Sequence, residues 1–585
     1  IIRILFYNFA SQFSIMMHVA YEVAMPNPAT HVFKFTLHIK GVTEEFVHLE
    51  LPVWTPGSYL VREYAKNVNA LKATDTQGDT LPVVKTQKNS WAVYAAGNDF
   101  TVTYEIYAFE ESVRTCWLDS SHASIIPAAC FLWVAGYEGG VEITIHPHES
   151  FKKIATALPN TQNNVWQLIA ADKDTLYDSP IEIGNHETYT FEAAGIPHTL
   201  AIYGEGNHNA QQIITDLIKI IDTEVNIFQS HPCDKYLFIL LNSHTQRGGL
   251  EHLFSTSLIF KRFGYSARTS YLEFISLCAH EYFHLWNVKR LRPAALGPFN
   301  YGEENYTTGL WVAEGFTSYF DDLIVYRAGI YTENEYLNVV EKNINDAENA
   351  PGKHVQSVAE ASFDAWIKYY RQNENSNNSQ VNYYVRGGVL ALLLDLMIIR
   401  YSKGEHNIND VMRDAYNQFY LQRNQGFTEA ELKTILEHYT GENLDWFYDN
   451  HVFGTTPIDY SIFAAFGLLL VNQNEGKLEL DLGIVINDKN TIQSIRKNSA
   501  GEKGGLNVND EIIAINNFRY TSGLLNQFTE NKSAGDTIQL TISRSGVLQT
   551  FEVTLQNTDK VDYKLTPLES AGAAQKSLYE FWLKR

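Results

Sequence analysis

The sequence contains little cysteine and no pair of cysteines spaced for metal binding. Four cysteines occur among 585 residues, too few for a disulfide scaffold. None of them belongs to a C-x-x-C pair, which argues against a site built from thiolates. The four are Cys116, Cys130, Cys233 and Cys278.

Long apolar runs are also missing. Beyond the N-terminus, no stretch reaches the roughly 18 apolar residues that a membrane-spanning helix requires, so we expect no membrane span. Residues 4–17 are mostly apolar, but polar residues interrupt them and no good cleavage site follows. We therefore expect a natural start near Met16 or Met17 and a cytoplasmic protein. The alternative is a periplasmic or secreted protein, if residues 1–20 are the remnant of a signal peptide.

Basic residues are outnumbered by acidic ones. The chain has 45 Lys and Arg against 67 Asp and Glu, which gives a net charge of −22. Such a charge repels the phosphate backbone of nucleic acids, and we expect no nucleic-acid partner. An acidic surface is compatible with substrates that carry an amine, although it serves solubility equally well.

The hydrophobic pattern changes twice along the chain. Residues 18–195 contain short alternating runs, such as Val32–Ile39 and Phe100–Tyr107, which predict strands. From Ala210 to Ile227 apolar residues recur at spacings of three and four, which predicts a helix, and further helical patterns follow, one of them Tyr271–Val288. The polar stretch at 372–380 is predicted to be a loop. After about residue 465 short strand patterns return. The pattern predicts three folded parts: a β-rich domain, a mainly helical domain and a small β-rich module.

The strongest motif for chemistry is His280-Glu281-Tyr282-Phe283-His284. Positions four apart lie on one face of a helix, so both imidazoles can reach one metal ion. Glu281 flanks that face, where it can take a proton from water and pass it to a leaving amine. The alternative is a helix with two histidines that have only structural partners.

A catalytic zinc ion needs a third protein ligand. Glu314 is a single carboxylate inside the apolar helical stretch Trp311–Phe320, and a bound cation would offset the cost of burying it. A buried salt bridge is the alternative explanation. Glu303 and Glu304 compete for the same role, but their polar surroundings predict solvent exposure.

These motifs resemble a known family. H-E-x-x-H followed by E-G-F-T-S-Y-F is similar to the gluzincin metallopeptidases. More narrowly, His280–Arg290 resembles the glycyl aminopeptidase family, whose members carry a C-terminal PDZ domain. Three further segments match that family in the same order: Leu51–Tyr59, Asp364–Tyr370 and Tyr383–Arg400. The resemblance covers nearly the whole chain after residue 17.

The resemblance implies a multidomain α+β fold. We expect an N-terminal β-rich domain at 17–197, a thermolysin-like and mainly α-helical catalytic domain at 198–460, a PDZ-like domain at 461–560 and a C-terminal tail at 561–585. It also implies one Zn²⁺ per chain, held by His280, His284 and Glu314. In the related aminopeptidase N family, eighteen residues separate the second histidine from the third ligand. That count leads to Glu303, whereas twenty-nine residues separate Glu314 from His284.

Two further site assignments depend on the resemblance. Tyr384-Val385-Arg386-Gly387 is similar to the Tyr-x-Lys-Gly of aminopeptidase N relatives, which implies that the Tyr384 hydroxyl stabilises the oxyanion. Gly248-Gly249-Leu250-Glu251-His252 is similar to their Gly-x-Met-Glu-Asn strand, which implies that Glu251 binds the substrate's amino group and that the two glycines admit its backbone. A glycine turn before an ordinary strand is the alternative.

We therefore predict a zinc aminopeptidase that removes small N-terminal residues, glycine or alanine, from peptides. A zinc endopeptidase and a peptide-binding PDZ adaptor with a vestigial metal site remain as alternatives. The PDZ-like module is expected to bind a peptide C-terminus, with Phe466–Leu469 as its candidate loop, or simply to pack on the catalytic domain. The oligomeric state cannot be predicted from the sequence.

Overall fold

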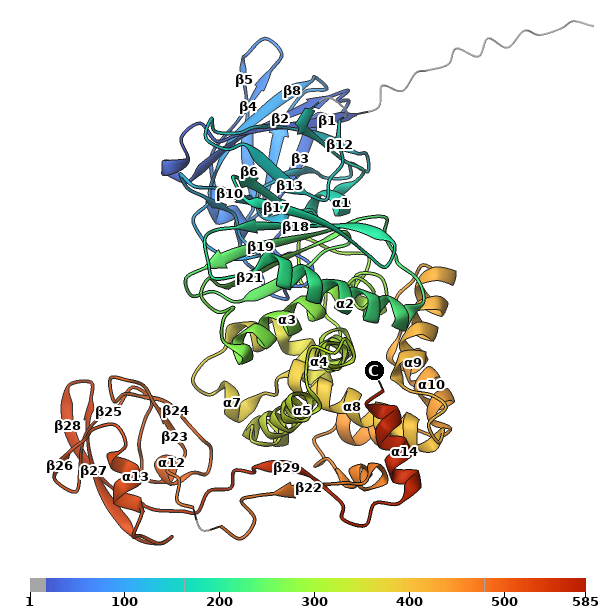
Figure 1. Ribbon diagram of the computed structural model, residues 1–585. Helices are drawn as coiled ribbons and strands as arrows, with labels where there is room; N and C mark the ends of the chain where they lie inside the picture. Colours follow the sequence, from blue (N-terminus) through green and yellow to red (C-terminus); the bar gives the residue numbers. More distant parts are fainter. Residues whose placement is uncertain (1–16, 162–163, 478, 585) are drawn as a thin grey trace, which may run out of the picture.

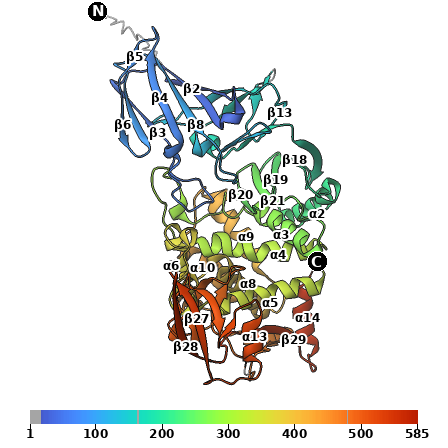
Figure 2. The ribbon, with the colours of Figure 1, turned by 90° about the vertical axis from the view of Figure 1, so that its left-hand side faces the viewer.

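The protein is described by a computed structural model that covers residues 17–161, 164–477 and 479–584. The first two parts follow one another along the molecule, with the β-rich first domain at one end and the second domain at the other (Figure 1). The small β-rich module lies to one side of the second domain and stands in front of it in the view of Figure 2. This is the mixed α+β multidomain architecture expected from the sequence. The expectation of a start near Met16 falls mainly on residues 1–16, outside the described residues.

The first domain is built from three sheets. The largest has the strand order β14-β15-β12-β1-β2-β8-β4-β5, and buried residues alternate along its central strands β1, β2, β8 and β12. The two predicted strands are found in it as β2 (Val32–Lys40) and β8 (Phe100–Tyr107), paired antiparallel. The other strands of this sheet are β1 (His18–Ala24), β4 (Val68–Asp75), β5 (Thr80–Leu81), β12 (Val141–His146), β14 (Asn160–Thr161) and β15 (Asn164–Ala170).

The second domain joins a five-stranded sheet to a group of helices. The sheet has the order β17-β18-β19-β21-β20. Strand β17 lies within the range expected for the first domain, but its hydrogen bonds are to β18 of this second sheet. The strand bounds are β17 (Glu187–Ala193), β18 (Ile196–Tyr203), β19 (Tyr236–Ser243), β20 (Gly248–Glu251) and β21 (Ser255–Lys261). Strand β20 pairs only with β21 among the described strands and so forms an edge.

The helices of this domain carry the motif residues. The predicted helices are found as α2 (Ala210–Phe228), α3 (Arg268–Phe283), α4 (Thr317–Arg327), α5 (Glu333–Glu348), α8 (Tyr383–Tyr401) and α10 (Glu429–Thr440). One prediction was wrong in its extent. The pattern predicts a helix to Val288, but α3 ends at Phe283 and the chain continues in turns. The expected polar loop at 372–380 contains the short helix α7 (Ser376–Ser379).

The PDZ-like module is joined to the second domain by a ribbon of two antiparallel strands. The chain enters the module through β22 (Leu468–Asn472) and leaves it through β29 (Tyr563–Pro567), which pairs with β22. The stretch expected to be a C-terminal tail contains β29 and helix α14 (Ala573–Trp582), which packs on the second domain with Trp582 fully buried. The core of the module has the sheet order β26-β25-β27-β28. Its strands are β25 (Glu511–Ile515), β26 (Phe518–Arg519), β27 (Thr537–Arg544) and β28 (Val547–Thr554).

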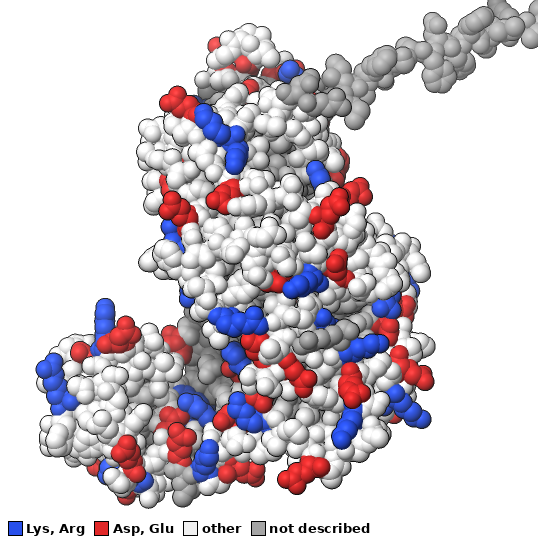
Figure 3. Space-filling view, viewed as in Figure 1, with Lys and Arg blue, Asp and Glu red and all other residues white. Residues whose placement is uncertain are grey.

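The cysteines, the charged side chains and the helices are arranged as the composition of the chain suggests. The four cysteines are buried and none forms a disulfide within the described residues. Acidic and basic side chains are interspersed on the face shown in Figure 3. In the described part of the chain, no helix combines the length and apolarity that crossing a bilayer demands.

Candidate metal centre

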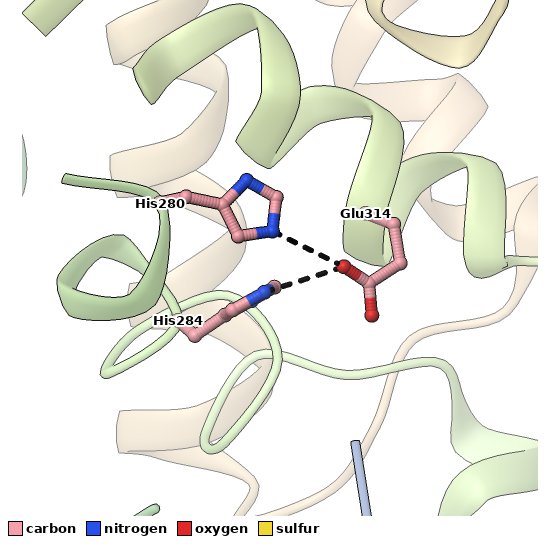
Figure 4. Close-up of side chains that lie close together, drawn as sticks. All are labelled: His280, His284 and Glu314. Carbon is pink, nitrogen blue, oxygen red and sulfur yellow. Dashed lines mark ion pairs between the residues drawn. The ribbon is translucent and has the colours of Figure 1, made fainter. Parts of the chain in front are cut away.

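The three predicted metal ligands lie close together. Glu314 Oε2 lies 3.5 Å from Nε2 of His280 and 3.3 Å from Nε2 of His284 (Figure 4). The ligand atoms of the three side chains all lie within 4.8 Å of one another. Glu314 is 2% exposed, so its carboxylate is removed from solvent. Two imidazoles and one carboxylate form a donor set that suits zinc and leaves a coordination position open.

Both imidazoles are oriented by partners on their other nitrogen. His280 Nδ1 lies 2.8 Å from Oδ2 of Asp321, in α4. His284 Nδ1 lies 2.7 Å from the carbonyl oxygen of Asn287. In both cases the proton belongs on Nδ1, which leaves the lone pair of Nε2 directed toward Glu314. Metal-binding histidines are typically oriented in this way, so the residues fit a metal ion.

The early end of α3 has a structural role in this arrangement. The amide nitrogen of His284 still bonds to the carbonyl of His280, at 3.3 Å, so the two rings keep the helical spacing. The Asn287 side chain donates to the carbonyls of Val312 and Ala313, at 3.1 and 3.3 Å. These bonds connect the turn after α3 to the π-helix η5 (Trp311–Phe316), which carries Glu314. The turn therefore holds two ligands in register with the third.

The Glu314 carboxylate and the two imidazoles form charged contacts with one another. Burial alone would raise the pKa of Glu314, but the charges and hydrogen bonds of His284 and His280 lower it to about 2. Burial would lower the pKa of His280, but its hydrogen bonds to Asp321 and Glu314 raise it well above its ordinary value. A metal ion bound by these side chains would supply the positive charge that the Glu314 carboxylate favours.

Glu281 lies beside this cluster with an unpaired carboxylate. Its Oε2 atom is buried and has no hydrogen-bond partner, and the residue is 5% exposed. Burial raises its pKa to about 7, although His280 and His284 oppose the change. A Cβ atom on Gly249 would overlap the Glu281 carboxylate, so a larger residue there would displace that side chain. The edge strand β20 thus runs directly past the proposed general base.

Glu251 belongs to a second acidic group at the same place. Its carboxylate, that of Glu281 and a ring nitrogen of His284 lie within 4.8 Å of one another. Glu251 is buried, and its Oε1 atom has no hydrogen-bond partner. Gly57 of the first domain, at φ +84°, lies against this carboxylate so closely that a Cβ atom would overlap it. The Leu51–Tyr59 segment therefore closes one side of the site.

The residue after Glu251 fixes the end of β20. His252 Nδ1 lies 3.1 Å from Oδ1 of Asp178, and the Leu253 amide donates to Oδ2 of Asp178 at 2.7 Å. Lys289 Nζ, just beyond α3, lies 2.7 Å from the same carboxylate. Asp178 of the first domain therefore joins the end of β20 to the segment that follows the metal-binding motif.

Tyr384 faces the same centre from the first turn of α8. Its ring lies 6.1 Å from that of His280 between centroids, and its hydroxyl lies 3.3 Å from that of Tyr370. Burial, followed by the charge of Glu314, raises the pKa of Tyr384 well above its ordinary value, so the hydroxyl stays protonated. The neighbouring Tyr383 is fully buried, and its hydroxyl has no hydrogen-bond partner.

A close approach of two backbones positions α8. A Cβ atom on Gly315 would lie 2.6 Å from the Cα atom of Gly387, so η5 and α8 pack with no side chain between them. Glu314 and Tyr384, one from each helix, are thereby brought close to each other. This explains a glycine on each side of the contact.

Two other predicted site residues or segments, a competing metal ligand and a peptide-binding loop, are not supported by the structure. Glu303 is exposed and its Oε1 atom accepts a hydrogen bond from Asn300, at 2.8 Å. The Phe466–Leu469 segment leads into β22 of the connecting ribbon, with Phe466 and Leu468 buried, so it does not form an open carboxylate-binding loop. Sequence reasoning also missed Gly57, Asp321 and Asn287, because no local pattern connects them to the motif.

Three family models match the chain. The M61 glycyl aminopeptidase model matches residues 273–390, which include the metal-binding motif, Glu314 and Tyr384. The Peptidase M61 N-terminal domain model matches residues 20–185, and a PDZ domain model matches residues 467–555. No curated protein matches the chain.

Solved structures extend the similarity to the whole chain. A crystal structure described as an aminopeptidase N family protein from Idiomarina loihiensis is 30% identical, with a TM-score of 0.91, and the match covers 97% of this chain and 100% of that one. An M1 zinc metallopeptidase from Deinococcus radiodurans is 13% identical over 76% of this chain and 94% of its own, with a TM-score of 0.47. Yeast LTA4 hydrolase is 14% identical over 77% of this chain and 69% of its own, with a TM-score of 0.46.

Proposed function

Because the chain belongs to the M61 glycyl aminopeptidase family, we propose that it is a zinc-dependent aminopeptidase that removes small N-terminal residues from peptides. The observation that carries the proposal is the buried carboxylate of Glu314 between the Nε2 atoms of His280 and His284. Each imidazole has its other nitrogen hydrogen-bonded, so both are oriented to bind a cation.

One zinc ion per chain would be held by His280, His284 and Glu314. When bound, zinc polarises the scissile carbonyl and lowers the pKa of a water molecule. Two imidazoles and a single carboxylate are typical of such catalytic sites, so the nearby carboxylates of Glu281 and Glu251 are available for other roles. The fourth coordination position of the zinc ion would have no protein ligand.

Glu281 acts as the general base in this proposal. Its carboxylate takes a proton from the attacking water and returns it to the leaving amine. A pKa raised to about 7 by burial suits a group that both accepts and donates a proton, and a cation held beside it would lower that value. Tyr384, whose hydroxyl remains protonated, donates a hydrogen bond to the oxyanion.

Glu251 would select for a free N-terminus. A buried carboxylate with an unpartnered oxygen strongly favours a cationic group, and the α-ammonium of a peptide supplies one. The strand β20 has a free edge, so an extended substrate can pair with it while its amine reaches Glu251. This distinguishes an exopeptidase from the alternative zinc endopeptidase.

The first domain supports a preference for glycine or alanine. Gly57 and Tyr59 bring its backbone and a buried ring to the amine end of β20. Burial raises the pKa of Tyr59, and the carboxylates of Glu314 and Glu251 add to the effect, so the hydroxyl stays protonated. We expect these groups to leave little room beside the amine for a large first side chain.

The test compares zinc-loaded protein on glycyl and alanyl anilides, on leucyl anilide and on N-acetylated glycyl anilide. Glycyl and alanyl substrates should be cleaved fastest, and the acetylated substrate should not be cleaved because its blocked nitrogen carries no charge. The Glu281→Gln variant should bind zinc as the wild type does but lose at least about 10²-fold in kcat. Cleavage of the acetylated substrate would favour the endopeptidase, and a variant that keeps full activity would contradict the role of Glu281.

A further inference from the structure

One arginine of the first domain, Arg114, lies at the end of β20 that is opposite Glu251. Arg114 Nη2 donates to the carbonyl oxygen of Gly249, at 2.9 Å. Its Nη1 atom would be 3.8 Å from a Cβ atom on Gly248, with no other heavy atom within 4 Å of that position. The guanidinium therefore lies along the same strand that carries Glu251, three residues away.

Arg114 keeps unused hydrogen-bond donors at this position. Its Nε atom is buried and has no hydrogen-bond partner. The side chain as a whole is half-buried, and the only acceptor that it contacts among the described residues is the Gly249 carbonyl. A buried donor without a partner costs free energy that a ligand can recover.

Arg62 is a second cation of the first domain whose charge interacts with that of Arg114. Its Nε and Nη2 atoms donate to the hydroxyl of Ser58, at 3.3 and 3.0 Å. Burial lowers the pKa of Arg62; Tyr64 opposes this change, and the charge of Arg114 adds to it. In the described part of the chain, neither arginine has a carboxylate within 4.0 Å. Both are therefore half-buried cations without a paired anion among the described residues.

The order of residues along β20 relates the position of Arg114 to the substrate. Glu251 lies at the end that would bind the substrate amine, and Gly249 lies against Glu281, the proposed general base for the scissile bond. A peptide that pairs antiparallel with β20 advances by about 3.3 Å per residue, so the residue after the scissile bond lies beside Gly248. Arg114 lies at that point.

We propose that Arg114 and Arg62 form a subsite for a carboxylate on the leaving-group side of the scissile bond. The inference rests on the proposed function, which orients the peptide along β20. A dipeptide would place its terminal carboxylate at the two arginines and its α-amino group at Glu251. A peptide with an acidic side chain after the scissile bond would offer the same chemistry. The preferred substrates are therefore short peptides with such a carboxylate.

The test compares kcat/KM for three substrates: glycyl-alanine, glycyl-alaninamide and the α-amide of glycyl-glutamic acid. Glycyl-alanine should exceed its amide by about 10- to 100-fold, as expected for charge-assisted hydrogen bonds. If the glutamyl amide is also fast, a side-chain carboxylate enters the subsite; if it is slow, only the terminal carboxylate does. Equal values for glycyl-alanine and both amides would overturn the proposal.

Variants distinguish a loss of carboxylate recognition from a general loss of activity. Arg62→Met and Arg114→Gln should reduce the ratio of acid to amide toward one, a change that a general loss of activity would not produce. Arg519→Met, at an exposed position of the PDZ-like module, is the control and should leave the ratio intact. A loss of activity that is equal for acid and amide would mean that the arginines are only structural.

Binding measurements keep this inference separate from the proposed function. Calorimetry on the zinc-loaded Glu281→Gln variant compares the affinities of glycyl-alanine and glycyl-alaninamide without turnover. At least tenfold tighter binding of the acid would support the subsite even if the wild type cleaved neither peptide, a result that would contradict the proposed function alone. Equal affinities would overturn the subsite whatever the activity.

Discussion

Asp321 Oδ2 lies 2.8 Å from Nδ1 of His280, on the side of the ring opposite Glu314. The contact joins α4 to α3 and determines which imidazole nitrogen is free to bind a metal ion. A carboxylate in this position also increases the basicity of the nitrogen that binds the metal. We therefore expect the strength of metal binding to depend on Asp321, which is not one of the proposed ligands.

Replacing Asp321 with asparagine should weaken zinc binding by about 10- to 100-fold, because the ring of His280 loses its charged partner. Competition with a chromophoric chelator measures the dissociation constant. Asp322→Asn is the matched control: burial and the charge of Asp321 raise the pKa of Asp322 to about 8, so it is mostly neutral at pH 7. Similar affinities for the Asp321 variant and the wild type would contradict the orienting role.

Metal removal should destabilise the protein. Zinc that binds only the folded state adds about 4 kcal/mol to the free energy of unfolding at a thousandfold excess over Kd. Thermal unfolding with chelator and with added zinc measures the shift. The His284→Ala variant should show little zinc-dependent shift, and an equal shift in this variant would indicate that zinc binds elsewhere.

Gly249→Ala should reduce kcat by at least about 10²-fold, because the new Cβ atom overlaps the Glu281 carboxylate and displaces it. Zinc content should remain that of the wild type, since Glu281 is not an assigned ligand. The control is Gly302→Ala, at an exposed glycine where a Cβ atom meets only a side-chain oxygen at 3.4 Å. Steady-state kinetics and metal analysis are measured together, and an active Gly249→Ala enzyme would exclude this packing.

Tyr384→Phe should reduce kcat by about 10²- to 10³-fold with little change in KM, since it removes one oxyanion donor. Tyr383→Phe provides a control one residue away. The hydroxyl of Tyr383 is buried without a hydrogen-bond partner, so its loss should leave both activity and stability close to those of the wild type. If the Tyr383 variant were the inactive one, the assignment would move to that residue.

The stability contributed by Asp178 should be lost in acid. Burial would raise the pKa of Asp178, but the charge of Lys289 and the contacts of His252 lower it to about 2. A carboxylate with a lowered pKa stabilises the folded state above its unfolded pKa of about 3.9, and this contribution falls as the pH drops from about 4 toward 2.

Asp178→Asn should therefore destabilise the protein by about 2 to 3 kcal/mol at pH 6, and the difference from the wild type should shrink in acid. Urea unfolding between pH 6 and pH 3 measures the difference, if the wild type remains folded over that range. A difference independent of pH would mean that the ion pair does not cause it.

The local part of the site could be predicted from the sequence. His280 and His284 share a face because they are four residues apart, and Glu314 is identified by the cost of burying a lone carboxylate in an apolar helix. The structure brings these three side chains together, and their roles stay predictions. The end of α3 could not be predicted, because residues 284–288 keep an apolar pattern while Asn287 bonds to a helix distant in sequence.

The contacts between the first and second domains could not be predicted from the sequence. Gly57 and Arg114 lie more than 100 residues before β20, and nothing in their local sequence indicates that they reach it. The three parts and their order could be predicted, since the hydrophobic period changes from one part to the next. Strand β17 was assigned to the neighbouring domain because its alternating pattern does not reveal which sheet it joins.

The ribbon of β22 and β29 makes the PDZ-like module an insertion within the catalytic domain, because the chain returns to add α14 and bury Trp582. A stop codon placed before the module would therefore also delete a core indole, whose Nε1 donates to the Tyr319 hydroxyl at 3.2 Å. The module can instead be excised by a short turn that joins Asn472 to Tyr563, which face each other in the ribbon. Only such an internal splice can separate the contribution of the module from the integrity of the enzyme.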